Sequence, residues 1–345
     1  MSPEGPSAAP PLTAAASPPR TDACYKPRSS MREVLVIGGG VVGLSSAIVL
    51  AEAGYDVQVA ARALGEATTS AVAAAFWYPY RAYPEDQVTR LAARSLARFA
   101  ALRQDASAGV LWREALEVFP EPVAAPGWSI AAEGFAPADP ATLPAGYRGG
   151  YRFRTAVVET PIYLEWLRAR AGALGVRVVQ RTLTSLDEAL AERPCVINCA
   201  GLGARELAAD PSVYPVRGQV VRVDNPGVTQ VWIDEHSGPA ITYIVPRSGD
   251  VVLGGTSEDH QEDRAPNPEH TRQILARCAA LEPRLAGARV RSVAVGLRPA
   301  RASVRLAAEP RGAGLVVHNY GHGGAGVTLS WGCAEAVREL LRASP

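Results

Sequence analysis

The chain of 345 residues lacks an excess of charge of either sign, because 35 lysines and arginines are balanced by 34 aspartates and glutamates. The formal net charge at pH 7 is only +1. A protein that binds the phosphate backbone of nucleic acid usually carries a strongly basic surface, which attracts that backbone. The near-neutral balance therefore argues against nucleic acid as a partner.

Cysteine is scarce, and no two cysteines form a C-x-x-C pair. The five cysteines are an odd number: Cys24, Cys195, Cys199, Cys278 and Cys333. A disulfide framework needs paired cysteines, and a cysteine-bound zinc ion needs closely spaced ones. We therefore predict free thiols in a reducing cytoplasm, with no disulfide framework and no metal site.

Long apolar runs and a secretory signal are missing as well. No stretch reaches the roughly 18 to 20 apolar residues needed to cross a bilayer, so the 48% apolar content is assigned to a soluble core and no membrane partner is expected. Residues 1–30 lack the charged and apolar regions of a signal peptide and are rich in proline, alanine and serine. We interpret them as a disordered extension, with Met31 as an alternative initiator.

The residues after this extension predict a complete βαβ unit. Val34–Ile37 is a short apolar run rich in β-branched residues, which is typical of a buried parallel strand. Gly38, Gly40 and Gly43 follow with the G-x-G-x-x-G spacing, which permits a tight turn, the approach of a pyrophosphate and close packing of the next helix. Residues 44–59 complete the unit with a helix and a second strand. This context indicates dinucleotide binding, with a ligand-free tight turn as the alternative.

A run of small residues follows the βαβ unit and begins with Thr68, Thr69 and Ser70. Such a run cannot build a core of its own. We interpret it as a segment that lies against a flat ligand and offers hydroxyl groups to phosphates. A polar loop that leads into a buried alanine helix is the alternative.

The rest of the chain alternates between helical and strand patterns. Arg90, Arg94, Arg98 and Arg103 share one face of a helix predicted at residues 87–106, and we interpret this face as solvated. Further helices are predicted at 44–53, 160–174, 270–281 and 328–341, and strands at 57–59, 111–113, 151–153, 176–179, 195–198, 219–223, 231–233, 243–245, 251–253, 290–297 and 314–318.

The spacing of these elements predicts an α/β fold with an inserted sheet. Strand patterns follow one another quickly between residues 213 and 255, which favours antiparallel pairing over further βαβ units. We therefore predict a Rossmann-type dinucleotide-binding domain and a second, largely antiparallel β-sheet domain that binds the substrate. The first domain is assigned to residues 31–80, 155–210 and 290–345, and the second to residues 81–154 and 211–289.

An arginine stands in a strand pattern where a flat ligand has room. On a strand, Ala294, Gly296 and Arg298 point to one face, and the apolar residues between them point to the other. Two small residues beside a guanidinium leave space for a flat group, and arginine holds a carboxylate through two parallel hydrogen bonds. A surface arginine on an edge strand is the alternative.

The glycine-rich segment from His318 to Trp331 is predicted to form a second loop that approaches a ligand. Its glycines permit close approach of the backbone, and Thr328 is predicted to open the terminal helix, whose N-terminus favours an anion. His318 and His322 are four residues apart, but they lie in a loop with no neighbouring carboxylate. We interpret them as structural residues rather than as metal ligands.

At these residues the chain resembles the D-amino acid oxidase family of flavoproteins. The matching segments run in family order across about residues 31–335: VLVIGGGVVGLSSA, TTSAVAAAFWYPY, INCAGLGA, PVRGQVVRV, TYIVPRSGDVVLGGT, VGLRPAR and HNYGHGGAGVTLSWG. The resemblance implies FAD as the cofactor and oxidative deamination of neutral D-amino acids, by hydride transfer from the substrate Cα to flavin N5. The implied products are a 2-oxo acid, ammonia and hydrogen peroxide, with dioxygen as the second substrate.

The resemblance also implies roles for residues of this chain. Arg298 would hold the substrate carboxylate, Tyr243 would support it, and the Gly324 carbonyl would accept a hydrogen bond from the substrate amine. Tyr78 joins these three in the implied substrate pocket. FAD would be bound by a larger set: Gly38, Gly39, Gly40, Val41, Val42, Gly43, Ala61, Arg62, Thr68, Thr69, Ser70, Ala74, Ala75, Phe76, Leu183, Gly201, Arg298, Gly323, Gly324, Ala325, Gly326, Val327 and Thr328.

Three features depart from the family pattern. Arg62 stands where an acidic residue for the ribose is expected, which leaves NADP as an alternative cofactor. Pro239 stands where the family has a second active-site tyrosine, in a lid at residues 234–240, so we expect a more open pocket that admits larger apolar D-amino acids. The matching segments offer no extra arginine for a second carboxylate, which favours neutral over acidic substrates.

Other classes remain open from the sequence. A D-aspartate oxidase or a glycine oxidase-like flavin amine oxidase is the first alternative, and a non-enzymatic or NADP-binding Rossmann protein is the second. Members of the family are often dimers, but no self-complementary patch in the sequence indicates a homodimer for this chain.

Overall fold

The structure is a computed structural model that describes residues 32–238 and 241–344. The extension predicted at residues 1–30 lies outside the described residues, as does Pro239, on which the expectation of a more open pocket rests. Within the described ranges, no helix is both long enough and apolar enough to cross a membrane.

Strands and helices follow one another along the whole described chain. The first part contains β1 (Glu33–Ile37), α1 (Val41–Glu52), β2 (Asp56–Ala61), α2 (Thr69–Val72), α3 (Glu85–Leu102), β3 (Val110–Phe119), β4 (Glu133–Pro137), β5 (Gly149–Val158), α4 (Thr160–Ala173), β6 (Arg177–Gln180), α5 (Leu186–Glu192), β7 (Cys195–Asn198) and α6 (Ala204–Leu207). The second part contains β8 (Tyr214–Val223), β9 (Val231–Asp234), β10 (Thr242–Pro246), β11 (Val251–Gly254), β12 (Glu258–Asp259), α7 (Pro268–Leu281), β13 (Val290–Arg311), β14 (Gly314–His322) and α8 (Gly326–Ala343).

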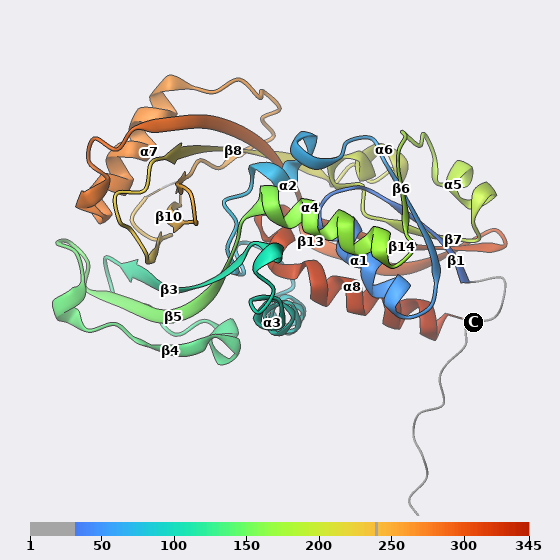
Figure 1. Cartoon of the computed structure of the whole chain (residues 1–345), viewed down its shortest axis with the longest axis horizontal. Helices are drawn as coiled ribbons and strands as arrows, with labels where there is room; N and C mark the ends of the chain where they lie inside the picture. The colour runs from blue at the N-terminus through green and yellow to red at the C-terminus, as the bar shows by residue number, and fades with distance from the viewer. Residues whose placement is uncertain (1–31, 239–240, 345) are drawn as a thin grey trace, which may run out of the picture.

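The strands of the described residues form one continuous sheet (Figure 1). Its order is β4-β5-β3-β9-β10-β11-β8-β13-β14-β7-β1-β2-β6, with β12 paired to β8. The half from β14 to β6 is parallel, as the βαβ pattern predicts, and the strands from β9 to β8 are antiparallel. The long strand β13 joins the halves, because residues 290–300 pair with β8 and residues 305–311 pair with β14.

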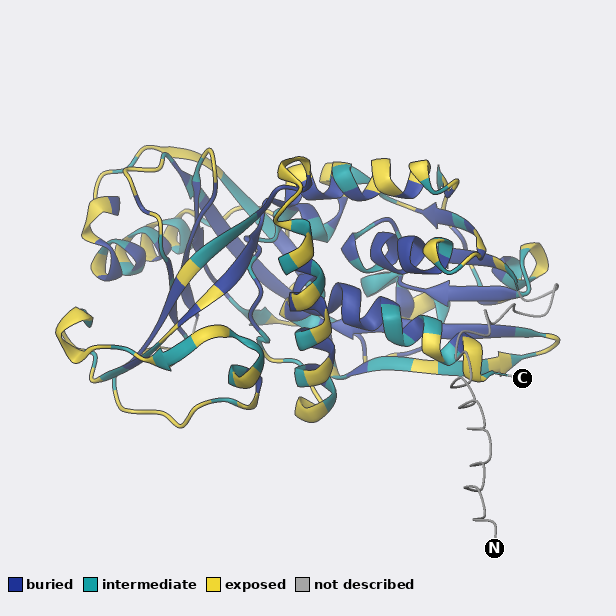
Figure 2. Ribbon diagram, turned by 60° about the horizontal axis from the view of Figure 1, so that its bottom comes forward, coloured by how far each residue is buried: buried dark blue, intermediate teal, exposed yellow. Residues whose placement is uncertain are grey.

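Helices cover both faces of the parallel half. Helices α1, α4 and α8 pack together on one face, and α5 packs on the other. Strand β1 shows why its sequence is apolar throughout, since Val34 and Val36 enter the larger core while Leu35 and Ile37 pack with Leu186 of α5. Strands β1, β2, β7 and β14 are accordingly mostly buried (Figure 2), whereas the edge strand β6 is not.

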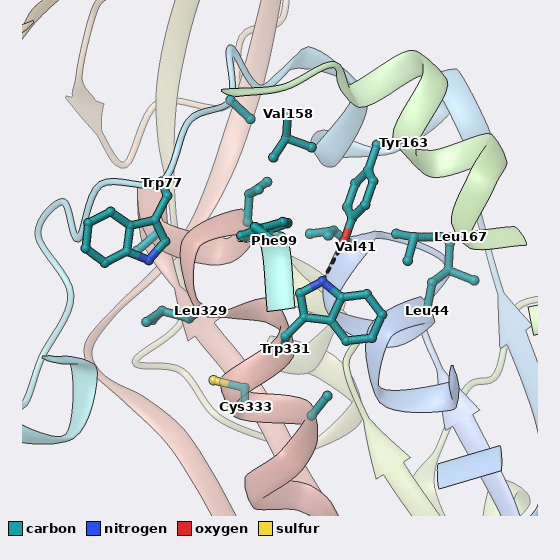
Figure 3. Packing of buried hydrophobic residues seen from close by; sticks show 14 of the residues in the cluster. Val41, Leu44, Trp77, Phe99, Val158, Tyr163, Leu167, Leu329, Trp331 and Cys333 are labelled. Atoms are coloured by element: carbon teal, nitrogen blue, oxygen red, sulfur yellow. Dashed lines mark hydrogen bonds between the residues drawn. The ribbon is translucent and has the colours of Figure 1, made fainter. Parts of the chain in front are cut away.

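A hydrogen bond joins α4 and α8 inside the larger core (Figure 3). Trp331 Nε1 donates to Tyr163 Oη over 2.7 Å, and both side chains are fully buried. A buried indole N–H needs such an acceptor, because an unpaired donor in the core is destabilising. Leu164 and Leu167 are buried as well, so this face of α4 points into the core.

Helix α7 covers one face of the antiparallel strands. Ile274 and Cys278 of α7 pack in one cluster with Val221 of β8 and Leu253 of β11. Because successive residues of a strand point to opposite faces, Val220 of β8 faces the larger core instead. The side of β8, β10 and β11 away from α7 is thus turned toward the parallel half, and the cavity described below lies there.

Several predicted helix boundaries are wrong, among them the start of α1, which begins at Val41 rather than at residue 44. The helix predicted at 87–106 ends at Leu102, because the Asp105 side chain accepts a hydrogen bond from the Ser107 amide and starts a separate 3₁₀ turn. The predicted glycine loop before the terminal helix is largely strand, since β14 continues to His322 by pairing with β13, and α8 begins at Gly326 rather than at Thr328.

The arginine face of α3 is solvated at Arg90, Arg94 and Arg103, as predicted, but not fully at Arg98. The Arg98 guanidinium lies 4.7 Å from the centre of the Trp331 ring and forms an ion pair with α1. This arginine therefore also contributes to the contact of α3 with α8 through a cation–π interaction.

Candidate active site

A cavity of about 620 Å³ lies where the parallel strands β1, β2 and β7 end. Its wall runs from the glycine turn after β1 to the antiparallel strands, where Tyr243 and Arg298 face it. Open α/β sheets bind their ligands at the carboxyl ends of the strands. The cavity is therefore where the fold predicts a dinucleotide.

The glycine turn brings the ends of β1 and β7 together. Gly38 has a φ of +122°, and a Cβ there would lie 2.3 Å from the Cys199 carbonyl oxygen. A Cβ at Gly43 would lie 2.0 Å from the Gly38 carbonyl oxygen, so the missing side chain lets α1 pack directly on the turn. These are the contacts that the spacing of the first and third glycines predicts.

The N-terminus of α1 faces the cavity without a side-chain cap. The Val41 amide donates to Ser70 Oγ over 3.1 Å, which leaves other amides of the first turn for an anion. A Cβ at Gly40 would lie 2.9 Å from the same Ser70 oxygen and would narrow this approach. The cradle is therefore suited to the pyrophosphate of a dinucleotide.

The hydroxyl groups of the small-residue run are partly engaged by the protein itself. Thr68 Oγ1 donates to the Gly65 carbonyl over 2.7 Å, and Thr69 Oγ1 donates to the Leu297 carbonyl over 3.2 Å. Both threonines line the cavity, but these protons are not free for a phosphate. The alternative of a buried alanine helix is wrong, because only the single turn α2 is helical in this run.

Arg298 of β13 lies with its guanidinium flat against Gly218 of β8. A Cβ at Gly218 would lie 2.4 Å from Nη1 and 2.5 Å from Cζ of Arg298, so only glycine leaves room for the guanidinium. Nη1 donates to the Thr256 carbonyl over 2.9 Å, and the other N–H groups remain for a ligand. The half-buried guanidinium lines the cavity and can hold a carboxylate.

Tyr243 of β10 pairs with Gly254 of β11 and packs closely against it. A Cβ at Gly254 would lie 2.0 Å from Tyr243 Cζ, so this position also requires glycine. Burial raises the pKa of Tyr243, although the neighbouring Arg298 guanidinium opposes this effect. The phenol therefore stays protonated at neutral pH and can donate to an anion beside Arg298.

Gly324 lies in the 3₁₀ turn Gly323–Ala325, between β14 and α8, and borders the cavity. A Cβ there would lie 2.9 Å from Cδ1 of Tyr80 and 3.7 Å from Cδ of Arg298. The glycine backbone thus faces the cavity next to the arginine.

Aromatic rings enclose the part of the cavity near Arg298. The Phe76 ring centre lies 5.8 Å from that of Tyr78 and 5.9 Å from that of Tyr243. All three residues line the cavity, together with Tyr80. Their rings form a largely apolar wall beside a single fixed guanidinium.

The hydroxyl of Tyr78 is engaged by two carboxylates outside the cavity wall. It lies 2.7 Å from Glu117 Oε1 and 3.0 Å from Glu235 Oε2. Burial raises the pKa of Glu117 to about 7, against the hydrogen bond from Tyr78, which lowers it. Tyr78 therefore borders the cavity as predicted, but its polar atom is already satisfied.

The two histidines of the last strand do not share a metal site. His318 Nε2 lies 3.1 Å from Glu309 Oε2, and His322 Nε2 lies 3.1 Å from Asn319 Oδ1. Burial lowers the pKa of His322 to about 4, so this residue is neutral at pH 7 where it lines the cavity. Within the described ranges, no group of three or more His, Cys, Asp or Glu residues is arranged to hold a metal ion.

The structure brings nearly all of the predicted cofactor residues to one cavity. Ala61 and Ala325 are the exceptions, because both are buried and neither borders it. Thr328 lines the cavity, but its hydroxyl donates to the Tyr78 carbonyl over 3.0 Å and so fixes the aromatic segment on the first turn of α8. Arg62 is exposed at the end of β2, on the cavity wall.

Several wall residues were not predicted. Arg181, Thr182 and Thr184 flank the predicted Leu183, and Arg264 lies on the segment after β12. Tyr80 also belongs to the wall. Its position two residues after the predicted Tyr78, in the same aromatic segment, is the sequence feature that could have indicated it.

The chain matches the family model of FAD-dependent oxidoreductases over residues 33–340. It is 50% identical over 314 residues to a protein of Rubrobacter xylanophilus named D-amino-acid oxidase, covering 90% of this chain and 96% of that protein. A protein of the same name from Streptomyces coelicolor is 45% identical over 315 residues, covering 89% and 96%. A D-aspartate oxidase of Homo sapiens is 36% identical over 324 residues, covering 88% and 93%.

Among solved structures, the glycine oxidase of Geobacillus kaustophilus superposes with a TM-score of 0.74 and 19% sequence identity, covering 90% of this chain and 95% of that one. This similarity concerns the fold alone. The family match and the relatives exclude the NADP-binding and ligand-free alternatives. The chain therefore belongs to the D-amino-acid oxidase family of FAD-dependent oxidoreductases, and its cofactor is FAD.

Proposed function

We propose that this protein oxidises neutral D-amino acids to 2-oxo acids, with release of ammonia and hydrogen peroxide. The observation that carries the proposal is the Arg298 guanidinium, which lies flat on Gly218 beside the Tyr243 hydroxyl in the wall of the dinucleotide cavity. A fixed cation at this place suits the carboxylate of an amino acid. The names of the relatives at 50% and 45% identity support the same reaction.

FAD would extend along the cavity described above. The N-terminus of α1 and Ser70 would bind its pyrophosphate, and the exposed Arg62 would lie near the adenosine end. Residues 74–76 and 323–328 would border the flavin ring. The N-terminus of α8, which begins at Gly326, would favour negative charge on the nearby part of the ring.

Three fixed points would select the D-configuration. Arg298 and Tyr243 would hold the carboxylate, the Gly324 carbonyl would accept a hydrogen bond from the amine, and the aromatic wall would take the side chain. Fixing three substituents of the Cα determines which of its faces meets the flavin. In the L-enantiomer the Cα hydrogen and the side chain exchange places, so the side chain instead of the hydrogen would face the flavin ring.

The protein residues would supply placement rather than proton transfer. When bound, FAD accepts the hydride of the substrate Cα at N5, and dioxygen then takes up the electrons to give hydrogen peroxide. The Tyr243 phenol has a raised pKa, and the pKa of His322 is lowered to about 4. At neutral pH the Tyr243 phenol is therefore protonated and the His322 imidazole is only a weak base. Neither side chain is suited to remove a proton from the substrate.

The charges around the pocket favour a neutral side chain. Four arginines line the cavity: Arg62, Arg181, Arg264 and Arg298. Of these four, Arg298 lies next to the aromatic wall, because Arg62 and Arg181 follow β2 and β6, and Arg264 lies in the segment whose Glu262 contacts α6. Arg81 lies over the Tyr80 ring, but it does not line the cavity and forms an ion pair with Glu235. The carboxyl group of Glu235, which lies near Tyr78, would also repel a second carboxylate.

An anaerobic titration of the yellow holoenzyme tests the proposal. D-Ala, D-Val, D-Phe, D-Lys, D-Asp and glycine would be added separately while the flavin absorbance is followed. We expect rapid bleaching with the neutral D-amino acids and slow or no bleaching with D-Asp and with every L-enantiomer. If small D-Ala clearly exceeds D-Phe in kcat/KM, the expected preference for larger apolar side chains is wrong.

D-aspartate oxidase is the second candidate, because the human relative with that name covers most of this chain. It predicts that D-Asp bleaches the flavin faster than any neutral substrate. This activity is disfavoured because, among the described residues, no second arginine lines the cavity beside the aromatic wall: Arg81 is paired with Glu235 outside it. A glycine oxidase-like activity would show the same pattern with glycine.

Other features of the protein also stand as proposals. We propose that residues 31–80, 155–210 and 290–345 form the FAD-binding domain, and that residues 81–154 and 211–289 form the substrate-binding and interface domain.

The four described cysteines are free and buried, which supports a reducing cytoplasm as the location. A homodimer is proposed by analogy with the family, and sedimentation of the holoenzyme tests it.

A further inference from the structure

Tyr80 is a polar residue of the cavity wall to which the function above assigns no role. Its hydroxyl oxygen is shielded from solvent and has no hydrogen-bond partner among the described residues. Buried polar groups are nearly always paired. An unpaired hydroxyl that borders a ligand cavity therefore indicates that the bound ligand supplies its hydrogen-bond partner.

The position of Tyr80 relative to Gly324 and Arg298 decides which ligand group it meets. A Cβ on Gly324 would lie 2.9 Å from Cδ1 of Tyr80 and 3.7 Å from Cδ of Arg298, so the three residues surround one point of the cavity. Burial raises the pKa of Tyr80, and the nearby Arg81 and Arg298 guanidiniums oppose this effect. The phenol remains protonated at neutral pH and is a donor there.

The neighbours of Tyr80 hold its ring but do not use its hydroxyl. The Arg81 guanidinium lies 5.2 Å from the ring centre and forms an ion pair with Glu235 at 3.7 Å. The Tyr80 amide donates to the Tyr78 carbonyl over 2.8 Å. Ser257 faces the phenol and also lowers its pKa, but no hydrogen bond of normal geometry joins the two side chains.

We propose that Tyr80 is a substrate-binding residue whose hydroxyl donates a hydrogen bond to the carboxylate that Arg298 holds. The substrate amine is assigned to the Gly324 carbonyl, and in its protonated form it carries no acceptor for the phenol proton. The carboxylate has two oxygens and several lone pairs, so it can accept from Arg298, Tyr243 and Tyr80 together. The inference rests on the proposed function, because it needs a substrate with a carboxylate.

The test uses the holoenzyme and its Tyr80→Phe variant, with Tyr83→Phe as the matched control, since Tyr83 is 56% exposed three residues further on. Propionate is the first probe, because it carries a carboxylate and no amine, and its Kd is read from the change in flavin absorbance. We expect Tyr80→Phe to raise this Kd about tenfold, as for loss of one hydrogen bond to a charged group. Tyr83→Phe should leave it unchanged.

A pair of substrates locates the hydrogen bond on the carboxylate. Tyr80→Phe should lower kcat/KM about tenfold for D-alanine and clearly less for D-alaninamide, whose uncharged carbonyl oxygen is a weaker acceptor than the carboxylate. Equal losses with both substrates would overturn the inference, because they would indicate a general change in packing. An unchanged propionate Kd would also overturn it.

Two further measurements separate a binding role from a structural one. Removal of an unpaired hydroxyl should leave the Tm of the holoenzyme unchanged or raise it, so a clear fall in Tm contradicts the inference. If Ser257→Ala reproduces the propionate defect, Ser257 is the partner of the phenol and the inference is wrong. If the unmodified holoenzyme oxidises no D-amino acid, the proposed function fails, while propionate binding still decides the role of Tyr80.

Discussion

The hydroxyl oxygen of Tyr78 lies 2.7 Å from Oε1 of Glu117, in a part of the protein where the carboxyl group is almost fully buried. The same hydroxyl lies 3.0 Å from Glu235 Oε2. A phenol has one proton and cannot donate to two carboxylates at once. Both contacts are hydrogen bonds only when one carboxyl group is protonated, and Glu117, whose pKa is raised to about 7 by burial, is the group that fits.

The raised pKa of Glu117 predicts a pH-dependent stability. An ordinary glutamate titrates near 4.5, so between this pH and about 7 the folded protein binds more protons than the unfolded chain. The free energy of unfolding should therefore fall as the pH rises through this window, by on the order of 2 kcal/mol. The stability is fully present below pH 4.5 and is lost above pH 7.

Urea unfolding at pH 5 and pH 8 measures this effect with a matched pair of variants. Glu117→Gln should reduce the difference between the two pH values, because its amide does not titrate. Glu114→Gln, at an exposed position of the same strand, should keep the difference of the parent protein. Asp234, Glu235 and His236 also face Glu117, so an unchanged slope in Glu117→Gln would assign the titration to one of them.

Arg298→Ala should weaken substrate binding strongly. A hydrogen-bonded charge pair of this kind contributes about 2 to 5 kcal/mol, so KM for a neutral D-amino acid should rise at least about thirtyfold. Arg264→Ala serves as the control, since Arg264 also lines the cavity but lies on the side of α6. Equal KM values for Arg298→Ala and the parent enzyme would remove Arg298 from the substrate site.

Gly218→Ala should displace Arg298 without removing its charge. The new Cβ would lie 2.4 Å from Nη1, so the guanidinium must move from its place beside Tyr243. We expect KM to rise about tenfold or more while the flavin stays bound. Gly249→Ala is the control, because a Cβ there meets no atom within 4 Å. A normal KM in Gly218→Ala would show that the exact position of the guanidinium is unimportant.

Gly40→Ala should weaken FAD binding rather than substrate binding. A Cβ at residue 40 would lie 2.9 Å from Ser70 Oγ, where the pyrophosphate approaches the first turn of α1. The Kd for FAD, measured by fluorescence titration of the apoprotein, should rise by about tenfold or more. Gly172→Ala in α4, which has open space at its Cβ, should bind FAD normally. Tight FAD binding by Gly40→Ala would place the pyrophosphate elsewhere.

Local patterns predicted the elements that depend on neighbouring residues. The run Val34–Ile37 is apolar on both faces, and the structure makes it a central strand with a core on each side. The face alternation of residues 294–298 also holds, because Gly296 and Arg298 line the cavity while Val293 packs on the side of α7. Such periodicities are properties of a few successive residues, and the sequence therefore shows them.

The segment from His318 to Gly326 is one for which the local sequence pattern predicted the wrong secondary structure. Its glycines are typical of a loop, yet residues 318–322 extend β14, because β13 supplies partners for their backbone groups. Strand β13 ends at Arg311 and β14 begins at Gly314, so the two form a hairpin, but the local glycine pattern does not show how far the pairing of a hairpin continues. The predicted separate sheets are joined into one by the long strand β13, because it also pairs with β8, which lies far away in the chain and which a local pattern does not indicate.

The sequence by itself determined the dinucleotide turn, the small-residue run and the strand that carries Arg298, since each depends on spacing within a few residues. Only the tertiary structure decided that Gly218 and Gly254 must lack side chains, because they lie under Arg298 and Tyr243 from neighbouring strands. It also placed the unpaired Tyr80 hydroxyl at the cavity and buried Glu117 beside Tyr78. Burial and pairing at these positions arise from contacts between distant segments, which exist only once the chain has folded.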